Sequence, residues 1–268
     1  MPLNGLPTRS KSRLSTAIQE ANQKNRLGLV VYIIPGFPNL ETYLDLKEML
    51  EQRECVSILE TTIPVHGDFA TASPTIIHAH LEANHALMGN TSPELLATQK
   101  PSFMVLYRQT YQEMGIVNFL QRYASVIDGI TLEWDDPHFI RQNFKSLNQF
   151  EVEFITGTYS NMALSEVENA LEYATQDGLI YLGCASITGG PMSAQSDIQA
   201  GARKIKTVRP HATIAAGMGI KTADDIRALA QIQQVDAVVV GTSFLQRAAQ
   251  GVTQAEIFLN EIEAALGR

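Results

Sequence analysis

The stretch GLIYLGCASITGGPMSA, residues 178–194, decides the fold expected for this chain. It begins as a short apolar run of strand-forming residues and changes into Gly, Ser and Thr just before a helical pattern starts. Two further stretches, AAGMGIKTADD (215–225) and VVVGTSF (238–244), follow the same plan. A (βα) barrel builds the loops of its C-terminal face in this way, so the three stretches predict consecutive units of one barrel.

The small residues of these loops predict a site for an anion. Glycine has no Cβ atom, so backbone N–H groups beside it can come close to a phosphate, and nearby hydroxyls offer further donors. No lysine is required for such a site. The phosphate-binding residues expected here are Thr188, Gly189, Gly190, Gly219, Gly241 and Thr242, with Gly217 and Ser243 beside them.

Eight strand-like runs recur along the chain at intervals that leave room for a loop and a helix. Several are nearly continuous apolar runs, which is typical of parallel strands covered on both faces. The runs are residues 27–34, 56–60, 102–107, 129–134, 151–156, 179–183, 212–217 and 237–241. The sequence therefore predicts an α/β fold, a single (βα)8 TIM barrel with a parallel eight-stranded sheet, as one domain over residues 1–268.

An open doubly wound sheet is the alternative architecture. Its dinucleotide-binding form needs a G-x-G-x-x-G turn directly after the first strand. Residues 35–39 read PGFPN at that place, a stiff turn with a single glycine. The barrel is therefore favoured.

Composition limits the possible partners. The chain of 268 residues is 45% hydrophobic and carries a formal net charge of −8, which opposes diffuse binding to nucleic acid or to anionic lipid. No apolar run is long enough to span a membrane, and the basic first residues lack the apolar core of a secretory signal. We expect a cytoplasmic protein that binds a small ligand, with residues 1–15 as a loosely ordered leader.

Six short motifs, spread over nearly the whole chain, carry a resemblance to a known family. They are Gly36-Phe37-Pro38, Glu60-Thr61-Thr62-Ile63-Pro64, Pro74-Thr75-Ile76-Ile77, Tyr181 with Ile187-Thr188-Gly189, Gly217-Met218-Gly219-Ile220, and Gly241-Thr242. In their order and spacing these motifs resemble the α subunit of tryptophan synthase. That family is a (βα)8 barrel that cleaves indole-3-glycerol phosphate to indole and glyceraldehyde 3-phosphate.

The resemblance implies roles for particular residues. Glu60 matches the catalytic acid/base of the family, and Tyr181 matches the tyrosine that positions it. Tyr107 and Asp135 match two further pocket residues. The implied reaction needs no metal and no organic cofactor. Considered alone, Glu60 is equally consistent with a charged residue that closes a strand and pairs with Lys or Arg, and Tyr181 with an ordinary inward-facing aromatic.

The chain departs from the family pattern in several places. The family has an aspartate that accepts the indole N–H just before the Pro-Thr helix start, but residues 70–74 read ATASP. Asp68 and Asp135 are the candidate substitutes. The family also has an aspartate where this chain has Phe37, and the loop 65–73 is altered. The resemblance implies a β subunit as partner, while these changes oppose docking to a standard one.

Three functions are consistent with these observations. The first is a lyase of the tryptophan synthase α type that acts on a phosphorylated indole substrate. The second is a divergent paralogue that acts on another phosphorylated substrate in a specialised pathway. The third is a non-catalytic phosphate-binding barrel, which has no need of Glu60 or Tyr181.

Other polar clusters have simpler interpretations. His78, His80 and His85 lie in one predicted helix, where residues two apart point in different directions, so we expect surface histidines and no metal site. Glu133 in the run EWDDP (133–137) is expected as a solvated strand end. Arg108, beside Tyr107, is not part of the family pattern and is expected to meet a ligand carboxylate or phosphate that the family's usual substrate lacks.

Overall fold

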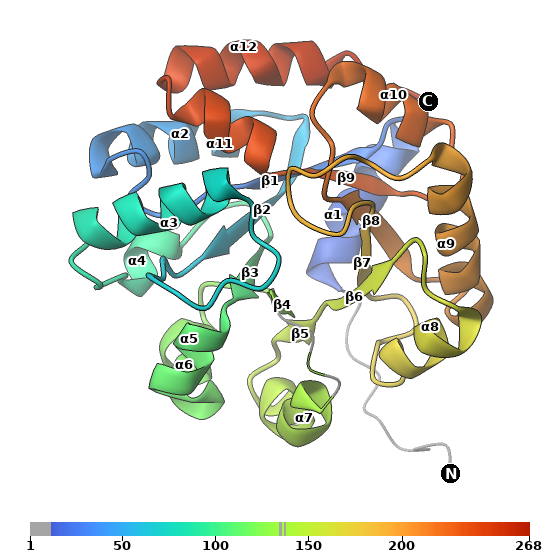
Figure 1. Cartoon of the computed structure of the whole chain (residues 1–268), viewed down its shortest axis with the longest axis horizontal. Helices are drawn as coiled ribbons and strands as arrows, with labels where there is room; N and C mark the ends of the chain where they lie inside the picture. The colour runs from blue at the N-terminus through green and yellow to red at the C-terminus, as the bar shows by residue number, and fades with distance from the viewer. Residues whose placement is uncertain (1–11, 134–135, 137) are drawn as a thin grey trace.

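The strands form one parallel sheet that curves into a barrel with helices on its outside (Figure 1). The computed structural model describes residues 12–133, 136 and 138–268. Within them the strands follow the spatial order β5-β4-β3-β2-β1-β9-β8-β7-β6. Their bounds are β1 Gly28–Tyr32, β2 Val56–Thr62, β3 Ser102–Leu106, β4 Gly129–Leu132, β5 Glu153–Phe154, β6 Thr156–Tyr159, β7 Leu179–Gly183, β8 Thr213–Gly217 and β9 Ala237–Val240.

The fifth predicted strand is divided into two. β5 pairs with β4, β6 pairs with β7, and Ile155 lies between the two short strands. The N–H of Ile155 donates to the carbonyl of Ile130 at 2.8 Å, so the chain itself closes the barrel at this point. The predicted TIM barrel is confirmed, and its fifth strand position is filled by two pieces rather than one continuous strand.

Helices alternate with the strands and cover the outer face of the sheet (Figure 1). Their bounds are α1 Arg13–Gln23, α2 Leu40–Gln52, α3 Pro74–Ala86, α4 Pro93–Leu96, α5 Arg108–Met114, α6 Ile116–Tyr123, α7 Phe139–Gln149, α8 Leu164–Ala170, α9 Gln195–Val208, α10 Ala223–Ala230, α11 Thr242–Ala248 and α12 Val252–Glu263. Polar caps begin several of them: Asn39 accepts the N–H of Thr42 at 2.9 Å, and Ser73 precedes Pro74 at the start of α3. None of the helices in the described ranges is long and apolar enough to cross a membrane.

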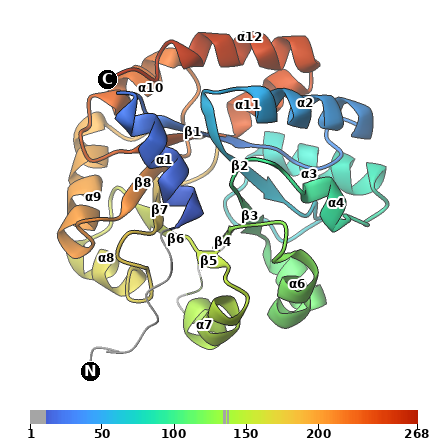
Figure 2. The same cartoon turned by 180° about the vertical axis from the view of Figure 1, so that it is seen from behind.

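Side chains from most of the strands fill the interior of the barrel. The interior cluster comprises Val30, Ile58, Phe103, Ile155, Leu179, Ala215, Ala237 and Val239, closed from below by Leu14 and Ile18 of α1. Both α1 side chains are fully buried. Figure 2, which shows the molecule from behind, places α1 in front of the strands. The interior is therefore a packed core, and a ligand can enter only from the opposite end of the barrel.

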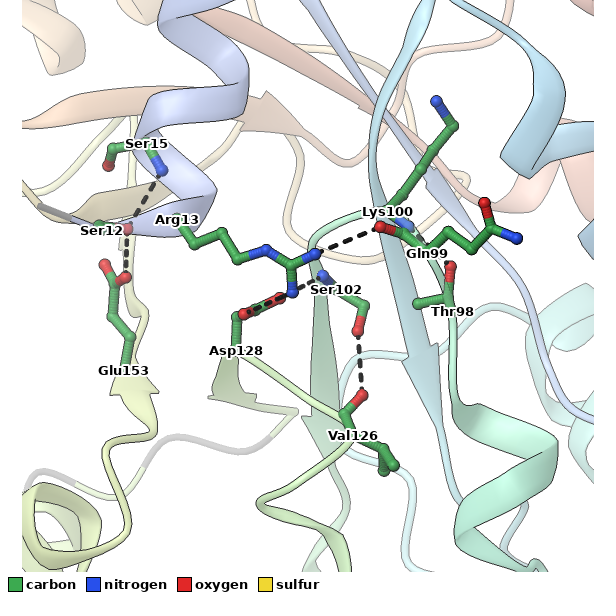
Figure 3. A network of polar contacts seen from close by, with 10 residues as sticks. All are labelled: Ser12, Arg13, Ser15, Thr98, Gln99, Lys100, Ser102, Val126, Asp128 and Glu153. Atoms are coloured by element: carbon green, nitrogen blue, oxygen red, sulfur yellow. Dashed lines mark hydrogen bonds and ion pairs between the residues drawn. The ribbon is translucent and has the colours of Figure 1, made fainter.

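Polar contacts hold α1 against the amino-terminal ends of the strands (Figure 3). Ser12 donates a hydrogen bond to Glu153, and Arg13 contacts Asp128 at 3.1 Å. Residues 1–11 lie outside the described residues, but Arg13–Gln23 is helical. At residues 13–15 the structure therefore differs from the loosely ordered leader expected for residues 1–15, because burial of Leu14 anchors this end of the helix.

Candidate functional site

A cavity that is open to solvent lies at the carboxyl ends of the strands. It brings together residues from β1, β2, β3, β6 and β7 with the loops that follow β4, β7, β8 and β9. Most of the predicted site residues line it: Glu60, Tyr107, Tyr181, Thr188, Gly189, Gly219, Gly241 and Thr242. Gly190 does not line this cavity, and Asp135 lies outside the described residues.

Glu60 is a buried acid in the wall of this cavity. Its residue is 6% exposed, and β2 continues two residues beyond it, so it is not at the strand terminus. Among the described residues its carboxyl group makes no hydrogen bond or ion pair, which removes the alternative of a strand-end charge paired with Lys or Arg. Burial raises the pKa of Glu60 to about 8. The group is therefore protonated near neutral pH and ready to donate a proton.

Tyr181 lies close to Glu60. The charge of Glu60 adds to burial, the larger cause, in raising the pKa of the Tyr181 hydroxyl. A Cβ atom at Gly217 would lie 2.2 Å from that hydroxyl oxygen. Gly217 thus makes room for a tyrosine at the neighbouring strand, and the expectation that it opens the backbone to an anion was wrong, since this residue does not line the cavity.

Two further aromatic rings pack against Tyr107, which lines the cavity. The rings of His80 and Tyr107 meet edge to face with their centroids 4.5 Å apart, and Phe69 contacts both. His80 is fully buried, so the prediction of a surface histidine was wrong at this residue. Within the described residues no group of three or more His, Cys, Asp or Glu side chains is arranged to hold a metal ion.

The glycine loops present free backbone donors to the cavity. The N–H groups of Gly189, Gly219 and Gly241 donate to no acceptor in the described part of the chain. Gly219 has φ of 87°, a backbone conformation that glycine adopts without strain. The N–H of Gly190, by contrast, donates to the carbonyl of Ile187 at 3.2 Å, which explains why Gly190 turns away from the cavity.

Thr188 joins the sixth predicted loop to the second. Its hydroxyl oxygen accepts the N–H of Ser73 at 2.7 Å, and its own N–H donates to the carbonyl of Thr71 at 3.0 Å. The predicted hydroxyl donor is also engaged with the loop between β2 and α3, since it donates to the carbonyl of Thr71 at 3.3 Å. Thr242 also contacts this region, with its hydroxyl 3.4 Å from that of Ser73.

Glu133 is a second buried carboxylate in the cavity wall. It accepts hydrogen bonds from the N–H groups of Ala70 at 2.8 Å and Ala72 at 3.2 Å, and from the N–H of Thr71 between them. The residue is only 8% exposed, so the prediction of a solvated strand end was wrong. Burial raises the pKa of Glu133, while these N–H donors oppose that rise. The Glu133 carboxylate thus contacts residues 70–72, in the loop segment where the sequence has no acidic residue.

Asp68 does not supply the missing acid to the cavity. Its side chain is 45% exposed and contacts Arg108 at 3.7 Å, outside the lining of the cavity. Arg108 is thus paired with a side chain of the protein, and its expected contact with a ligand group stays a prediction.

The loop of residues 65–73 is held in place from several sides. His80 accepts the N–H of Val65, and Gln109 accepts the N–H groups of His66 and Gly67. Phe37, the other altered position, is 4% exposed and belongs to the core between strands and helices. It does not line the cavity, so it packs in the protein and does not stack on a ligand.

The sequence prediction of the site did not include Tyr32 and Glu133, which line the cavity, or His80, which is buried beside it. Tyr32 carries the one hydroxyl in the apolar run of residues 27–34, a signal that was visible. The hydrogen bonds of His80 and Glu133 depend on how the loop 65–73 folds, and no local sequence pattern predicts them.

The fold and the cavity define the class of protein: a (βα)8 barrel with buried carboxyl groups and glycine loops at the open end of the barrel. The family model of the tryptophan synthase alpha chain matches residues 18–267, and the chain belongs to that family. The tryptophan synthase alpha chain of Thermoanaerobacter sp. (strain X514) is 24% identical over 266 residues, which is 94% of this chain and 96% of the relative. That of Dehalococcoides mccartyi is 27% identical over 250 residues, 88% of this chain and 91% of the relative.

Solved structures agree with the fold. A chain of tryptophan synthase from M. tuberculosis superposes with a TM-score of 0.82 at 17% identity, covering 97% of this chain and 100% of that one. Tryptophan synthase subunit alpha from Campylobacter jejuni gives a TM-score of 0.74 at 23% identity, covering 89% and 95%. The chain is therefore a divergent member of its family with the complete barrel.

Proposed function

We propose that this protein is a carbon–carbon lyase that cleaves indole-3-glycerol phosphate to indole and glyceraldehyde 3-phosphate. One observation carries the proposal: Glu60, a carboxyl group with a pKa of about 8, is buried in the cavity wall without a hydrogen bond from the described residues. Membership of the tryptophan synthase alpha chain family supplies the reaction class.

In this mechanism Glu60 acts first as an acid and then as a base. Its proton goes to the indole ring carbon that carries the glycerol chain. The resulting carboxylate takes the proton of the hydroxyl on the adjacent side-chain carbon, and the carbon–carbon bond breaks as that oxygen forms a carbonyl. The ring electrons return to indole, and Glu60 ends protonated as it began. A pKa near the working pH suits a group that must both give and take a proton.

The phosphate of the substrate would bind at the glycine loops. The unpartnered N–H groups of Gly189, Gly219 and Gly241 and the hydroxyl of Thr242 are suitable donors for a phosphate dianion. The indole ring would then extend toward Glu60 and Tyr181 in the same cavity.

Glu133 is the candidate for the second carboxylate that the substrate needs. Positive charge develops on the indole nitrogen when the ring carbon is protonated, and a fixed carboxylate beside that nitrogen stabilises it. The N–H groups of Ala70, Thr71 and Ala72 fix the Glu133 carboxylate in the cavity wall. We include Glu133 in the proposal as the acceptor for the indole N–H.

A tryptophan synthase β subunit is the partner that this proposal implies. Phe37 is buried, so it does not by itself obstruct a partner, and the altered loop 65–73 retains exposed residues such as His66 and Asp68. The experiment that tests the activity also measures stimulation by a β subunit.

The test is an assay of indole and glyceraldehyde 3-phosphate release from indole-3-glycerol phosphate, by the purified protein alone and with a β subunit. Release of both products in equal amounts supports the proposal, and stimulation by the β subunit adds the partner. If the protein binds glycerol 3-phosphate but releases no indole in either condition, the barrel acts on another phosphorylated substrate.

A further inference from the structure

Tyr32 and His80 form a buried hydrogen-bonded pair beside the cavity. Tyr32 lies at the end of β1 and lines the cavity, and His80 lies on α3 and is fully buried. The hydroxyl of Tyr32 is 3.0 Å from Nε2 of His80. On the other side of the ring, Nδ1 of His80 accepts the backbone N–H of Val65 at 3.1 Å.

These two contacts determine which of the two residues donates the hydrogen bond between them. A neutral imidazole has one nitrogen that donates and one that accepts. Because Nδ1 accepts from Val65, the ring proton is on Nε2, and His80 donates to the oxygen of Tyr32. Burial lowers the pKa of His80 to about 3, so the ring stays neutral throughout the neutral pH range.

The proton of Tyr32 must then point away from His80. The nearest recorded acceptor is the hydroxyl of Tyr107 at 3.5 Å, longer than the roughly 2.5–3.0 Å of a good O–H···O hydrogen bond. Burial raises the pKa of Tyr32, so the hydroxyl keeps its proton. The resting protein thus holds a donor at the cavity wall that has only a weak acceptor among the described residues.

This donor lies next to Glu60. Tyr32 and Glu60 are register partners on the adjacent parallel strands β1 and β2, and both line the cavity. Side chains at matching positions of neighbouring strands point to the same face of a sheet. A ligand oxygen that exchanges a proton with Glu60 therefore also lies near the hydroxyl of Tyr32.

We propose that Tyr32 donates a hydrogen bond to the substrate oxygen that becomes the carbonyl of the released aldehyde, and that His80 is the positioning residue that orients Tyr32. The role rests on the proposed lyase function. As that oxygen loses its proton to Glu60 it gains negative charge, and a pre-oriented O–H donor stabilises this charge without transferring its own proton. Tyr32 touches the reacting atom, whereas His80 acts only through Tyr32.

The test compares Tyr32→Phe, His80→Phe and the double variant in the indole-release assay. Phenylalanine at position 80 keeps a ring against Phe69 and Tyr107 but cannot donate to Tyr32. We expect Tyr32→Phe to lower kcat by ~10- to 100-fold with KM changed less than ~3-fold. His80→Phe should lower kcat less, and the double variant should be no more than ~2-fold slower than Tyr32→Phe, because His80 acts through the missing hydroxyl.

Tyr43→Phe is the matched control. It also removes a buried tyrosine hydroxyl, one that donates to the carbonyl of Leu95 at 3.0 Å and does not line the cavity. Unchanged kcat in Tyr32→Phe, or independent and multiplicative losses in the double variant, would overturn the proposal while the lyase function stands. If the wild-type protein releases no indole, the lyase function itself fails, and this role of Tyr32 fails with it.

Nitrogen NMR of the His80 ring adds a readout that does not depend on activity. His80 is expected to be the Nε2–H tautomer and to stay neutral down to about pH 4, since burial lowers its pKa to about 3. An Nδ1–H tautomer would reverse the direction of the pair and overturn the assignment of Tyr32 as a donor to the substrate.

Discussion

The hydroxyl of Tyr181 occupies the space that a Cβ atom at Gly217 would need, since the two would lie 2.2 Å apart. The relationship joins neighbouring strands, because Tyr181 is on β7 and Gly217 ends β8. Because Gly217 has no side chain, Tyr181 can occupy this position next to Glu60.

Gly217→Ala is therefore expected to displace Tyr181. A misplacement of about 1 Å near the reacting atoms can cost on the order of a hundredfold in rate, so kcat for indole release should fall by ~10-fold or more. Overpacking should also cost ~1–3 kcal/mol of unfolding free energy. Gly67→Ala is the control, because a Cβ there would meet nothing within 4 Å. Wild-type kcat in Gly217→Ala would show that Tyr181 does not depend on this glycine.

Glu60 should make stability depend on pH. The pKa of Glu60 is about 8 in the folded protein, against 4.5 for a glutamate in water, so between these values the unfolded chain releases the proton while the native state retains it. As pH rises from about 4.5 to about 8, the unfolding free energy of the wild type should therefore fall relative to that of Glu60→Gln, by up to ~5 kcal/mol. Below pH 4.5 both states of the wild type are protonated at Glu60, so this loss is absent. Urea unfolding of both proteins at pH 5 and pH 8 measures the difference. Parallel stability curves would mean that Glu60 ionises freely in the folded state.

Glu133→Gln should loosen the loop between β2 and α3. A glutamine amide can keep one oxygen as acceptor for the three N–H groups, but it loses the negative charge and puts an NH2 donor at the second oxygen position, 3.0 Å from the N–H nitrogen of Ala70. We expect a loss of ~1–3 kcal/mol of unfolding free energy and faster amide hydrogen exchange at residues 70–72. Asp68→Asn, in the same loop but exposed, should leave exchange at these residues unchanged. Slow exchange in the Glu133 variant would show that other contacts suffice to hold the loop.

Gly219→Ala should weaken phosphate binding. Gly219 has φ of 87°, and a Cβ there would lie 3.0 Å from the Cα of Met192, so the loop must move. Titration with glycerol 3-phosphate is expected to give at least ~10-fold weaker binding, because we propose that N–H groups of the glycine loops bind the phosphate. Gly89→Ala is the control for backbone strain, with φ of 69° but open space around the added atom. Equal affinity for wild type and Gly219→Ala would place the phosphate elsewhere.

The barrel and part of the cavity lining could be predicted from the sequence. Apolar runs that end in glycine loops located β7, β8 and β9, and Glu60 and Tyr181 lie in one cavity as the resemblance implied. Local patterns suffice here because a parallel strand and the loop that follows it are encoded together in sequence. The break at Ile155 was not visible, because it depends on which neighbour each half of the strand meets.

The second layer of the site could not be predicted in the same way. Glu133 looked like a solvated strand end because nothing near it in sequence shows that residues 70–72 turn their N–H groups toward it. His80 looked like a surface residue because its helix carries several histidines, while its environment is set by Tyr32 and Val65 from other parts of the chain. Contacts between distant loops decide both cases.

The pH dependence of kcat/KM for indole release, measured for the wild type and for Glu60→Gln, tests the central claim most directly. The account predicts that wild-type activity falls above pH about 8, as the buried acid loses its proton, and that Glu60→Gln releases no indole at any pH while still binding glycerol 3-phosphate. Indole release by Glu60→Gln at a rate close to that of the wild type would contradict it.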